Sequence, residues 1–176
     1  MKKVLLHVCC GVCAYASIER LKKEDFLPKA LFFNPNIQPE DEYQKRKISA
    51  VKVAQLTDID FIDTEYSVDD WQKACQAYAE EAEGGRRCDI CFEIRLEKAF
   101  EVAQAQGFDY FTTTLTISPH KKSQKIFEIG KKIGGDKFLP INFKKQEGFK
   151  KSIEAAKKFN LYRQDYCGCL YSKTNK

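Results

Sequence analysis

Seven of the eight cysteines fall into three short groups, and these groups are the residues best suited to chemistry. They are Cys9, Cys10 and Cys13, then Cys88 and Cys91, and finally Cys167 and Cys169. Only Cys75 stands apart from the others. Clustered thiols bind metal ions or iron–sulfur clusters, and they also carry out redox reactions. The spacing therefore predicts one redox metal site, assembled from three distant parts of the chain.

The kind of metal centre stays open between zinc and an iron–sulfur cluster, because Cys-x-x-Cys pairs occur in both. Neighbouring side chains of an extended strand point to opposite sides. Cys9 and Cys10 are therefore an awkward chelate for one small ion, unless the chain turns sharply at Gly11. A wider cluster is less affected by this restriction, so an iron–sulfur site is preferred and zinc is the alternative.

Cys167 and Cys169 are separated by one glycine, and they can form a disulfide only in a small, strained ring. Strained disulfides are usually labile or catalytic. Glycine between the two lowers the backbone cost of such a ring. The pattern predicts a reversible dithiol that handles two electrons, and a third pair of metal ligands is the alternative.

Length and composition predict a single domain over residues 1–176, large enough to bury a core without disulfides. The chain has no apolar run of membrane-spanning length and no signal-peptide pattern at its start. We expect a cytoplasmic protein with no membrane partner. In that reducing compartment clustered cysteines more often bind metal or do catalysis than form structural disulfides.

Charge is distributed unevenly along the chain. Residues 1–118 carry 15 Lys and Arg against 20 Asp and Glu, whereas residues 119–176 carry 15 against 5. The lysines of the second part are Lys121, Lys122, Lys125, Lys131 and Lys132, followed by Lys144, Lys145, Lys150, Lys151, Lys157 and Lys158. This balance predicts a nucleic-acid partner, with a solvated lysine surface as the alternative. Phe143, Phe149, Tyr162 and Tyr166 would offer stacking surfaces for bases, unless they belong to the core.

Hydrophobic periodicity predicts strands and helices in alternation. Strands are expected at 3–8, 29–33, 59–62 and 110–117, with a short edge strand at 138–141. Helices are expected at 14–23, 39–56, 69–83, 91–105, 123–133 and 148–159. This order predicts an α/β fold, a Rossmann-like parallel sheet with flanking helices and a helical, cysteine-bearing C-terminal part. Ligands of such sheets lie beyond the carboxyl ends of the strands, where the first cysteines follow the first strand.

Four blocks of the sequence resemble the cobalamin-independent epoxyqueuosine reductases of the QueH type. They are His7-Val-Cys-Cys-Gly-Val-Cys13, Arg87-Cys-Asp-Ile-Cys-Phe-Glu-Ile-Arg-Leu96, Thr112-Thr-Thr-Leu-Thr-Ile-Ser-Pro119 and Tyr162-Arg-Gln-Asp-Tyr-Cys-Gly-Cys169. Together they run from near the start of the chain to near its end. Val12 departs from the pattern, because proline is more usual there, and this change should affect the turn rather than the chemistry.

The resemblance implies the last step of queuosine synthesis, on tRNA carrying epoxyqueuosine in its anticodon loop. An epoxide is reduced to an alkene and its oxygen leaves as water, which takes two protons and two electrons from an unknown electron donor. The resemblance also implies a fold related to nucleotide α-hydrolases. In that fold the segment around Cys10 occupies the position of a phosphate loop.

The resemblance further implies roles for single residues. Cys9, Cys10, Cys88 and Cys91 are similar to the ligands of a [4Fe-4S] cluster, and Cys167 and Cys169 to a redox-active disulfide pair. Asp89 could replace one sulfur as a ligand and leave a cysteine for an additional iron, although an acid at a helix start is commonplace. Tyr162, Asp165, Tyr166, His7 and His120 are the candidate proton donors.

Two other functions stay open at this stage. The first is a zinc-stabilised nucleic-acid-binding module without catalysis. The second is a thiol-based tRNA sulfur-transfer enzyme that activates its substrate with ATP. No glycine-rich phosphate loop follows the first predicted strand, which argues against the second.

Overall fold

Four parallel strands form one sheet in the spatial order β3-β2-β1-β4 in the computed structural model, which describes residues 1–174. The strands are β1 (Lys2–His7), β2 (Phe26–Phe32), β3 (Phe61–Asp63) and β4 (Tyr110–Thr113). Their parallel order requires crossover connections, and helices supply most of them. The predicted α/β class with a Rossmann-like parallel sheet is confirmed.

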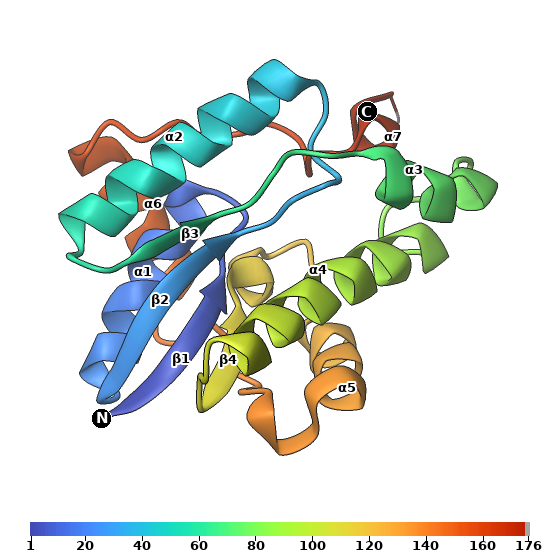
Figure 1. Ribbon diagram of the computed structural model, residues 1–176. Helices are drawn as coiled ribbons and strands as arrows, with labels where there is room; N and C mark the ends of the chain where they lie inside the picture. Colours follow the sequence, from blue (N-terminus) through green and yellow to red (C-terminus); the bar gives the residue numbers. More distant parts are fainter. Residues whose placement is uncertain (175–176) are drawn as a thin grey trace.

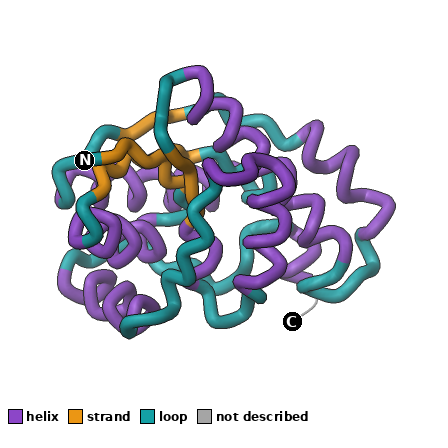
Figure 2. Tube along the Cα trace, turned by 90° about the horizontal axis from the view of Figure 1, so that it is seen from below, coloured by secondary structure: helices purple, strands orange, loops and turns teal. Residues whose placement is uncertain are grey.

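Helices cover both faces of the sheet (Figures 1 and 2). The α-helices are α1 (Gly11–Lys23), α2 (Glu40–Leu56), α3 (Asp69–Cys75), α4 (Arg86–Ala105), α5 (Ser123–Gly134), α6 (Gly148–Lys158) and α7 (Leu170–Thr174). Short 3-10 helices lie at Gln76–Tyr78, Thr114–Ile117 and Gly135–Lys137. Apolar residues of α1, α2 and α6 form the core on one face, and those of α4 and α5 form the core on the other. α3 and α7 lie beyond the carboxyl end of the strands (Figure 1).

β1 is central because both of its faces are apolar, as expected for a strand covered on both sides. Leu6 packs into the core beside α1, and Leu5 packs into the core beside α4. The chain then turns directly into α1 at Gly11. A Cβ at Gly11 would lie 2.3 Å from Ser49 Oγ on α2, so only glycine permits this close approach. The start of α1 is thereby fixed at the end of β1.

Four predicted elements differ from the structure by more than three residues or in kind. β4 ends at Thr113, because the Thr113 hydroxyl accepts from the Leu115 N–H at 3.2 Å and starts a 3-10 turn. α3 ends at Cys75 rather than at 83. The predicted edge strand at 138–141 is reduced to one bridge, between Phe111 and Phe138. α4 begins at Arg86, five residues earlier than predicted, which places its two cysteines inside the helix.

None of the helices within residues 1–174 is both long enough and apolar enough to cross a membrane.

Candidate metal and redox site

Three thiols meet where β1 passes into α1. The Sγ atoms of Cys9, Cys10 and Cys13 lie within 4.8 Å of one another, and no other group of potential metal ligands in residues 1–174 is gathered in this way. Cys10 is the extended N-cap residue of α1, and its sulfur accepts from the Cys13 N–H at 3.4 Å. The chain turns into the helix at Gly11, which is the exception allowed in the sequence-based prediction, so Cys9 and Cys10 do not point apart. The sulfurs of Cys9 and Cys10 are 3.9 Å apart.

The three thiols of this trio differ in how readily they lose a proton. Hydrogen bonds from the Cys10 and Cys13 thiols lower the pKa of Cys9 well below its usual value, and the nearby Arg95 charge acts in the same direction. The Cys13 thiol also acts to lower the pKa of Cys10, but hydrogen bonding to Cys9 and burial outweigh it and raise that pKa to about 12. Hydrogen bonds to Cys10 and Cys9, together with burial, raise the pKa of Cys13 well above its usual value. Cys9 is therefore the cysteine of the trio that loses its proton most readily.

Cys88 and Cys91 lie in the first two turns of α4. One turn further on, the buried guanidinium of Arg95 contacts Cys91 Sγ at 3.9 Å, and its charge also acts on Cys9. The Arg95 guanidinium therefore lies near sulfurs from two of the three cysteine groups. The Cys88 and Cys91 sulfurs do not join the close trio. The set Cys9, Cys10, Cys88 and Cys91 as cluster ligands stays a prediction.

The Cys167–Cys169 segment is fastened to α2 by the buried Arg46. The Arg46 guanidinium donates to the carbonyl oxygens of Cys167 at 2.9 Å and Tyr166 at 3.1 Å, and it pairs with Glu42 at 2.7 Å. The Gln38 N–H donates to the Gly168 carbonyl at 2.9 Å. These contacts place Cys167 at the carboxyl edge of the sheet, near the end of β1.

Cys169 lies behind Cys167 in a small buried cluster with Trp71, Cys75 and Cys91. Cys75 therefore does not stand apart in space, although it does in sequence. Burial raises the pKa of Cys75 to about 12 and keeps it a thiol. All eight cysteines, Cys167 and Cys169 included, are free thiols in this structure.

A pocket of about 380 Å³ lies between these groups. Cys9, Cys13 and Cys167 line it, and so does Lys121, whose ammonium is 3.4 Å from Cys167 Sγ. Burial acts to lower the pKa of Lys121, but the nearby sulfurs of Cys167 and Cys9 outweigh burial and raise it. Lys121, predicted to lie on an RNA-binding lysine face, thus directs its charge into the pocket instead.

The candidate proton donors occupy different positions. His120, Asp165 and Tyr166 line the pocket. The Tyr166 hydroxyl donates to the Gln38 carbonyl. The Tyr162 hydroxyl donates to Glu42 at 2.5 Å. His7 is fully buried between Thr113 Oγ1 at 2.8 Å and Phe33 O at 3.0 Å, and burial lowers its pKa to about 3.

Asp89 forms an ion pair with Lys125 of α5, at 3.1 Å between carboxylate and ammonium. Lys125 was predicted to face RNA, and this ion pair offsets part of its positive charge.

Gln164 also contacts the cysteine site. Its Nε2 donates to Cys10 Sγ at 3.2 Å, while its Oε1 is buried without a hydrogen-bond partner.

Sequence reasoning missed the pocket-facing roles of Cys13, Lys121, Arg46 and Arg95. Cys13 was visible in the sequence, because Cys10-x-x-Cys13 opens a helix where the first turn brings both residues together. Lys121 and Arg46 gave no such signal, because their partners are 46 and 121 residues away.

Replacing Gly168 by alanine should lower the free energy of unfolding by about 2–4 kcal/mol, since Gly168 has φ +134° and the new methyl would lie 3.0 Å from Asn36 Nδ2. Gly107→Ala is the matched control, because Gly107 has φ +67° and no atom within 4 Å of an added Cβ. The Gly107→Ala substitution should lower the free energy of unfolding by only about 1 kcal/mol. The midpoints of urea unfolding measure the stability of both variants. Equal losses of stability would contradict tight packing of the loop at Gly168.

The fold and the site define the class of this protein. It is a Rossmann-like α/β protein with clustered thiols at the carboxyl edge of its sheet. Two solved structures share the fold. The U34-tRNA thiolase NcsA from Methanococcus maripaludis, solved with its [4Fe-4S] cluster, matches with a TM-score of 0.61 and 14% identity over 97% of this chain and 61% of that one. The NH3-dependent NAD synthetase from Campylobacter jejuni matches with a TM-score of 0.51 and 16% identity over 91% of this chain and 65% of that one.

The chain belongs to the epoxyqueuosine reductase QueH family, whose model matches residues 4–175. The epoxyqueuosine reductase QueH of Streptococcus pyogenes is 38% identical over 179 residues, which cover 96% of this chain and 69% of that relative. The protein of the same name from Thermotoga maritima is 36% identical over 178 residues, which cover 98% and 91%. The resemblance on the four sequence blocks is confirmed.

Proposed function

We propose that this chain reduces the epoxide of epoxyqueuosine in tRNA to the alkene of queuosine, as an oxidoreductase of its family. The observation that carries the proposal is the pocket, in which sulfurs of two distant cysteine groups face one cavity beside the Lys121 ammonium. Reduction of a bound epoxide needs a source of electrons, a source of protons and a cavity, and the thiols and the ammonium can supply the first two.

The electrons come from Cys167 and Cys169 in this proposal. Both C–O bonds of the epoxide break, a carbon–carbon double bond forms, and the oxygen leaves as water with two protons. The two thiols lose two protons and two electrons and join in a disulfide. A reductant must then reopen it, and it would meet Cys167 first, because Cys169 is buried behind it.

The residues present fit an iron–sulfur cluster, because three thiol sulfurs lie within 4.8 Å of one another and Cys88 and Cys91 lie in the first two turns of α4. Cys9, Cys10, Cys88 and Cys91 would hold a [4Fe-4S] cluster, which supplies one-electron transfer when bound. Asp89 would bind an additional iron only after its carboxylate leaves Lys125.

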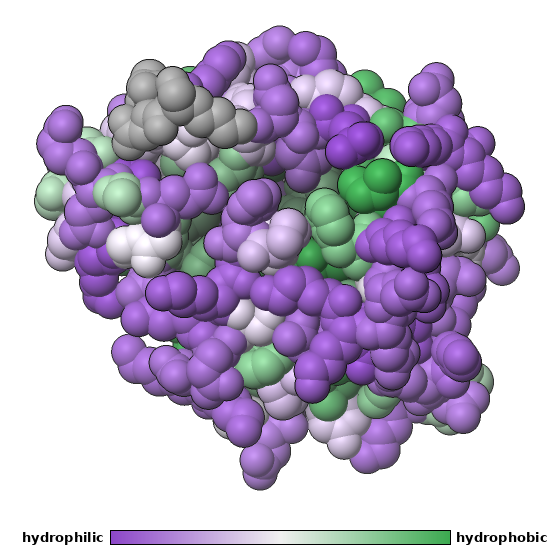
Figure 3. All heavy atoms as spheres, turned by 180° about the vertical axis from the view of Figure 1, so that it is seen from behind, coloured by the Kyte–Doolittle hydropathy of each residue, from purple (hydrophilic) through white to green (hydrophobic). Residues whose placement is uncertain are grey.

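The tRNA partner is supported by charge. Residues 119–176 carry 15 basic against 5 acidic side chains. The face opposite to Figure 1 is largely hydrophilic, and hydrophobic residues show in a hollow within it (Figure 3). Lysines fix the position of phosphates, and apolar surface receives unstacked bases.

Anaerobic purification tests the cofactor and the reaction together. The protein should be brown, carry iron and inorganic sulfide, and convert epoxyqueuosine to queuosine in tRNA when a chemical reductant is added. Nucleoside mass spectrometry measures the product, which is lighter by one oxygen. A colourless protein with zinc would instead support a zinc-stabilised RNA-binding module, and ATP-dependent sulfur incorporation would support a sulfur-transfer enzyme.

A further inference from the structure

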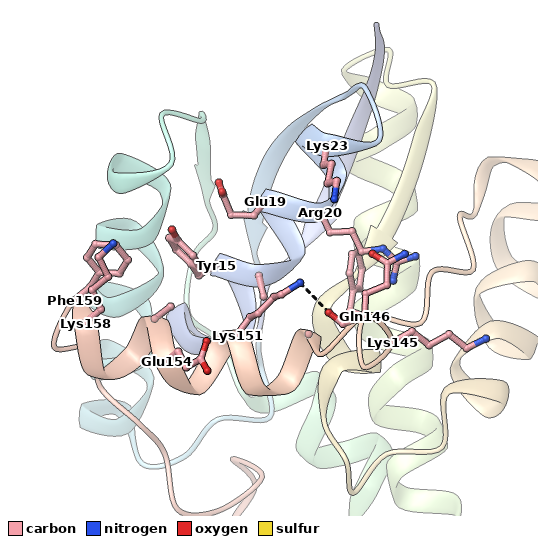
Figure 4. A pocket seen from close by; sticks show the side chains of 14 residues that line it. Tyr15, Glu19, Arg20, Lys23, Lys145, Gln146, Lys151, Glu154, Lys158 and Phe159 are labelled. Atoms are coloured by element: carbon pink, nitrogen blue, oxygen red, sulfur yellow. Dashed lines mark hydrogen bonds between the residues drawn. The ribbon is translucent and has the colours of Figure 1, made fainter.

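α6 lies between two hollows of the surface. On one side Phe149 and Ile153 line the pocket that holds Cys9 and Cys167. On the other side α6 and α1 enclose a groove of about 590 Å³. Figure 4 looks into this groove, where Lys151 and Lys158 of α6 lie opposite side chains of α1. A chain of nucleotides that places one base in the pocket can therefore continue across α6.

Phe149 is the aromatic residue at this pocket that is available for stacking. It is 42% exposed, whereas Phe143 is 1% exposed and belongs to the core. Tyr162 and Tyr166 are held by hydrogen bonds from their hydroxyls, to Glu42 and to the Gln38 carbonyl. A single exposed apolar side chain is ordinary on a protein surface. Phe149, however, lies in the wall of the candidate active site, where its ring can contact a bound base.

The charge of α6 matches an anionic strand. Within Gly148–Lys158 there are four lysines and one glutamate. Lys23 of α1 and Lys145, from the loop before α6, also line the groove. Lys151 Nζ donates to the Gln146 carbonyl at 2.9 Å (Figure 4), which orients the ammonium and leaves further N–H donors for a phosphate.

We propose that α6 is the RNA-binding element of this protein. Phe149 stacks on the base that neighbours the nucleoside in the pocket, and Lys151 and Lys158 contact phosphates of the same single-stranded loop. The assignment rests on the proposed function, because it takes tRNA as the substrate. The proposal names the residues that hold the single-stranded RNA loop while one of its bases reacts in the pocket.

Tryptophan fluorescence tests the stacking without reference to catalysis. The chain has one tryptophan, Trp71, which is 1% exposed and lies outside the pocket wall. Phe149→Trp should introduce emission that is quenched when an unmodified anticodon stem-loop RNA binds. Leu27→Trp is the control, because Leu27 is exposed and pairs with Lys3 at the opposite end of β1. Its emission should not change.

Affinity for the same RNA tests the energetic contribution. Phe149→Ala and Phe149→Leu should each weaken binding about 10-fold, because base stacking needs an aromatic face. Phe149→Tyr should bind as the wild type does. Lys151→Gln should reduce the slope of log affinity against log salt by about 1, whereas Lys98→Gln on α4, where Lys98 pairs with Glu101, should not.

Two outcomes separate this proposal from the reaction itself. Unquenched Phe149→Trp emission, with unchanged affinity of Phe149→Ala, would overturn the role of α6 even if the wild type reduces epoxyqueuosine. If the wild type never reduces epoxyqueuosine but the emission of Phe149→Trp is quenched on binding, the proposed function is refuted and α6 remains an RNA-binding element.

Discussion

Replacing Cys167 by serine should lower turnover by about 10³-fold or more and leave the visible absorption of the iron–sulfur centre unchanged. Cys167 lines the pocket and is the outer member of the Cys167–Cys169 pair. A serine hydroxyl cannot form a disulfide with Cys169, so the variant loses the proposed source of electrons. The backbone carbonyl of residue 167 still accepts from Arg46, so the loop should keep its position. Product formation and the absorption spectrum are measured on the same anaerobic sample.

Cys75→Ala is the matched control, because Cys75 is a buried thiol that does not line the pocket. It should lose some stability and retain turnover. Loss of the cluster absorption in Cys167→Ser would identify Cys167 as a metal ligand. Normal turnover in that variant would exclude the dithiol as the immediate source of electrons.

Lys121→Met should reduce kcat by about 100-fold, which is the lower end of what a positioned proton donor contributes. Its ammonium is 3.4 Å from Cys167 Sγ, and the Lys144 ammonium holds its backbone by donating to the Lys121 carbonyl at 2.6 Å. In the proposed reaction it can pass a proton from the sulfur to the departing oxygen. Single-turnover rates measured across pH separate this role from RNA binding.

The neighbouring Lys122 provides the control, since it is exposed and does not line the pocket. Lys122→Met should leave the single-turnover rate nearly unchanged. Lys121→Arg should restore part of the rate, because it keeps the positive charge. If the two methionine variants lose only RNA affinity, and lose it equally, Lys121 acts as a phosphate contact and not as a pocket residue.

The sequence determined the architecture because its signals are local. The apolar run at Val4–Val8 and the alternation of strands and helices require a covered parallel sheet. The three cysteine groups and the four family blocks are also short segments, each readable without knowledge of the fold. Ends of elements were less predictable. The strand at Tyr110 stops at Thr113 because one hydroxyl bonds to the backbone two residues later, which residue preference alone does not reveal.

Tertiary structure decided which side chains share the pocket. Cys75 reaches Cys91 and Cys169, Lys121 reaches Cys167, and Arg46 holds a loop 120 residues away. Each of these contacts joins elements that meet only when the sheet and its crossovers are complete. A lysine in a basic stretch has the same sequence pattern whether it faces solvent or a sulfur. Its charge is directed by the packing around it, and that packing exists only in the folded chain.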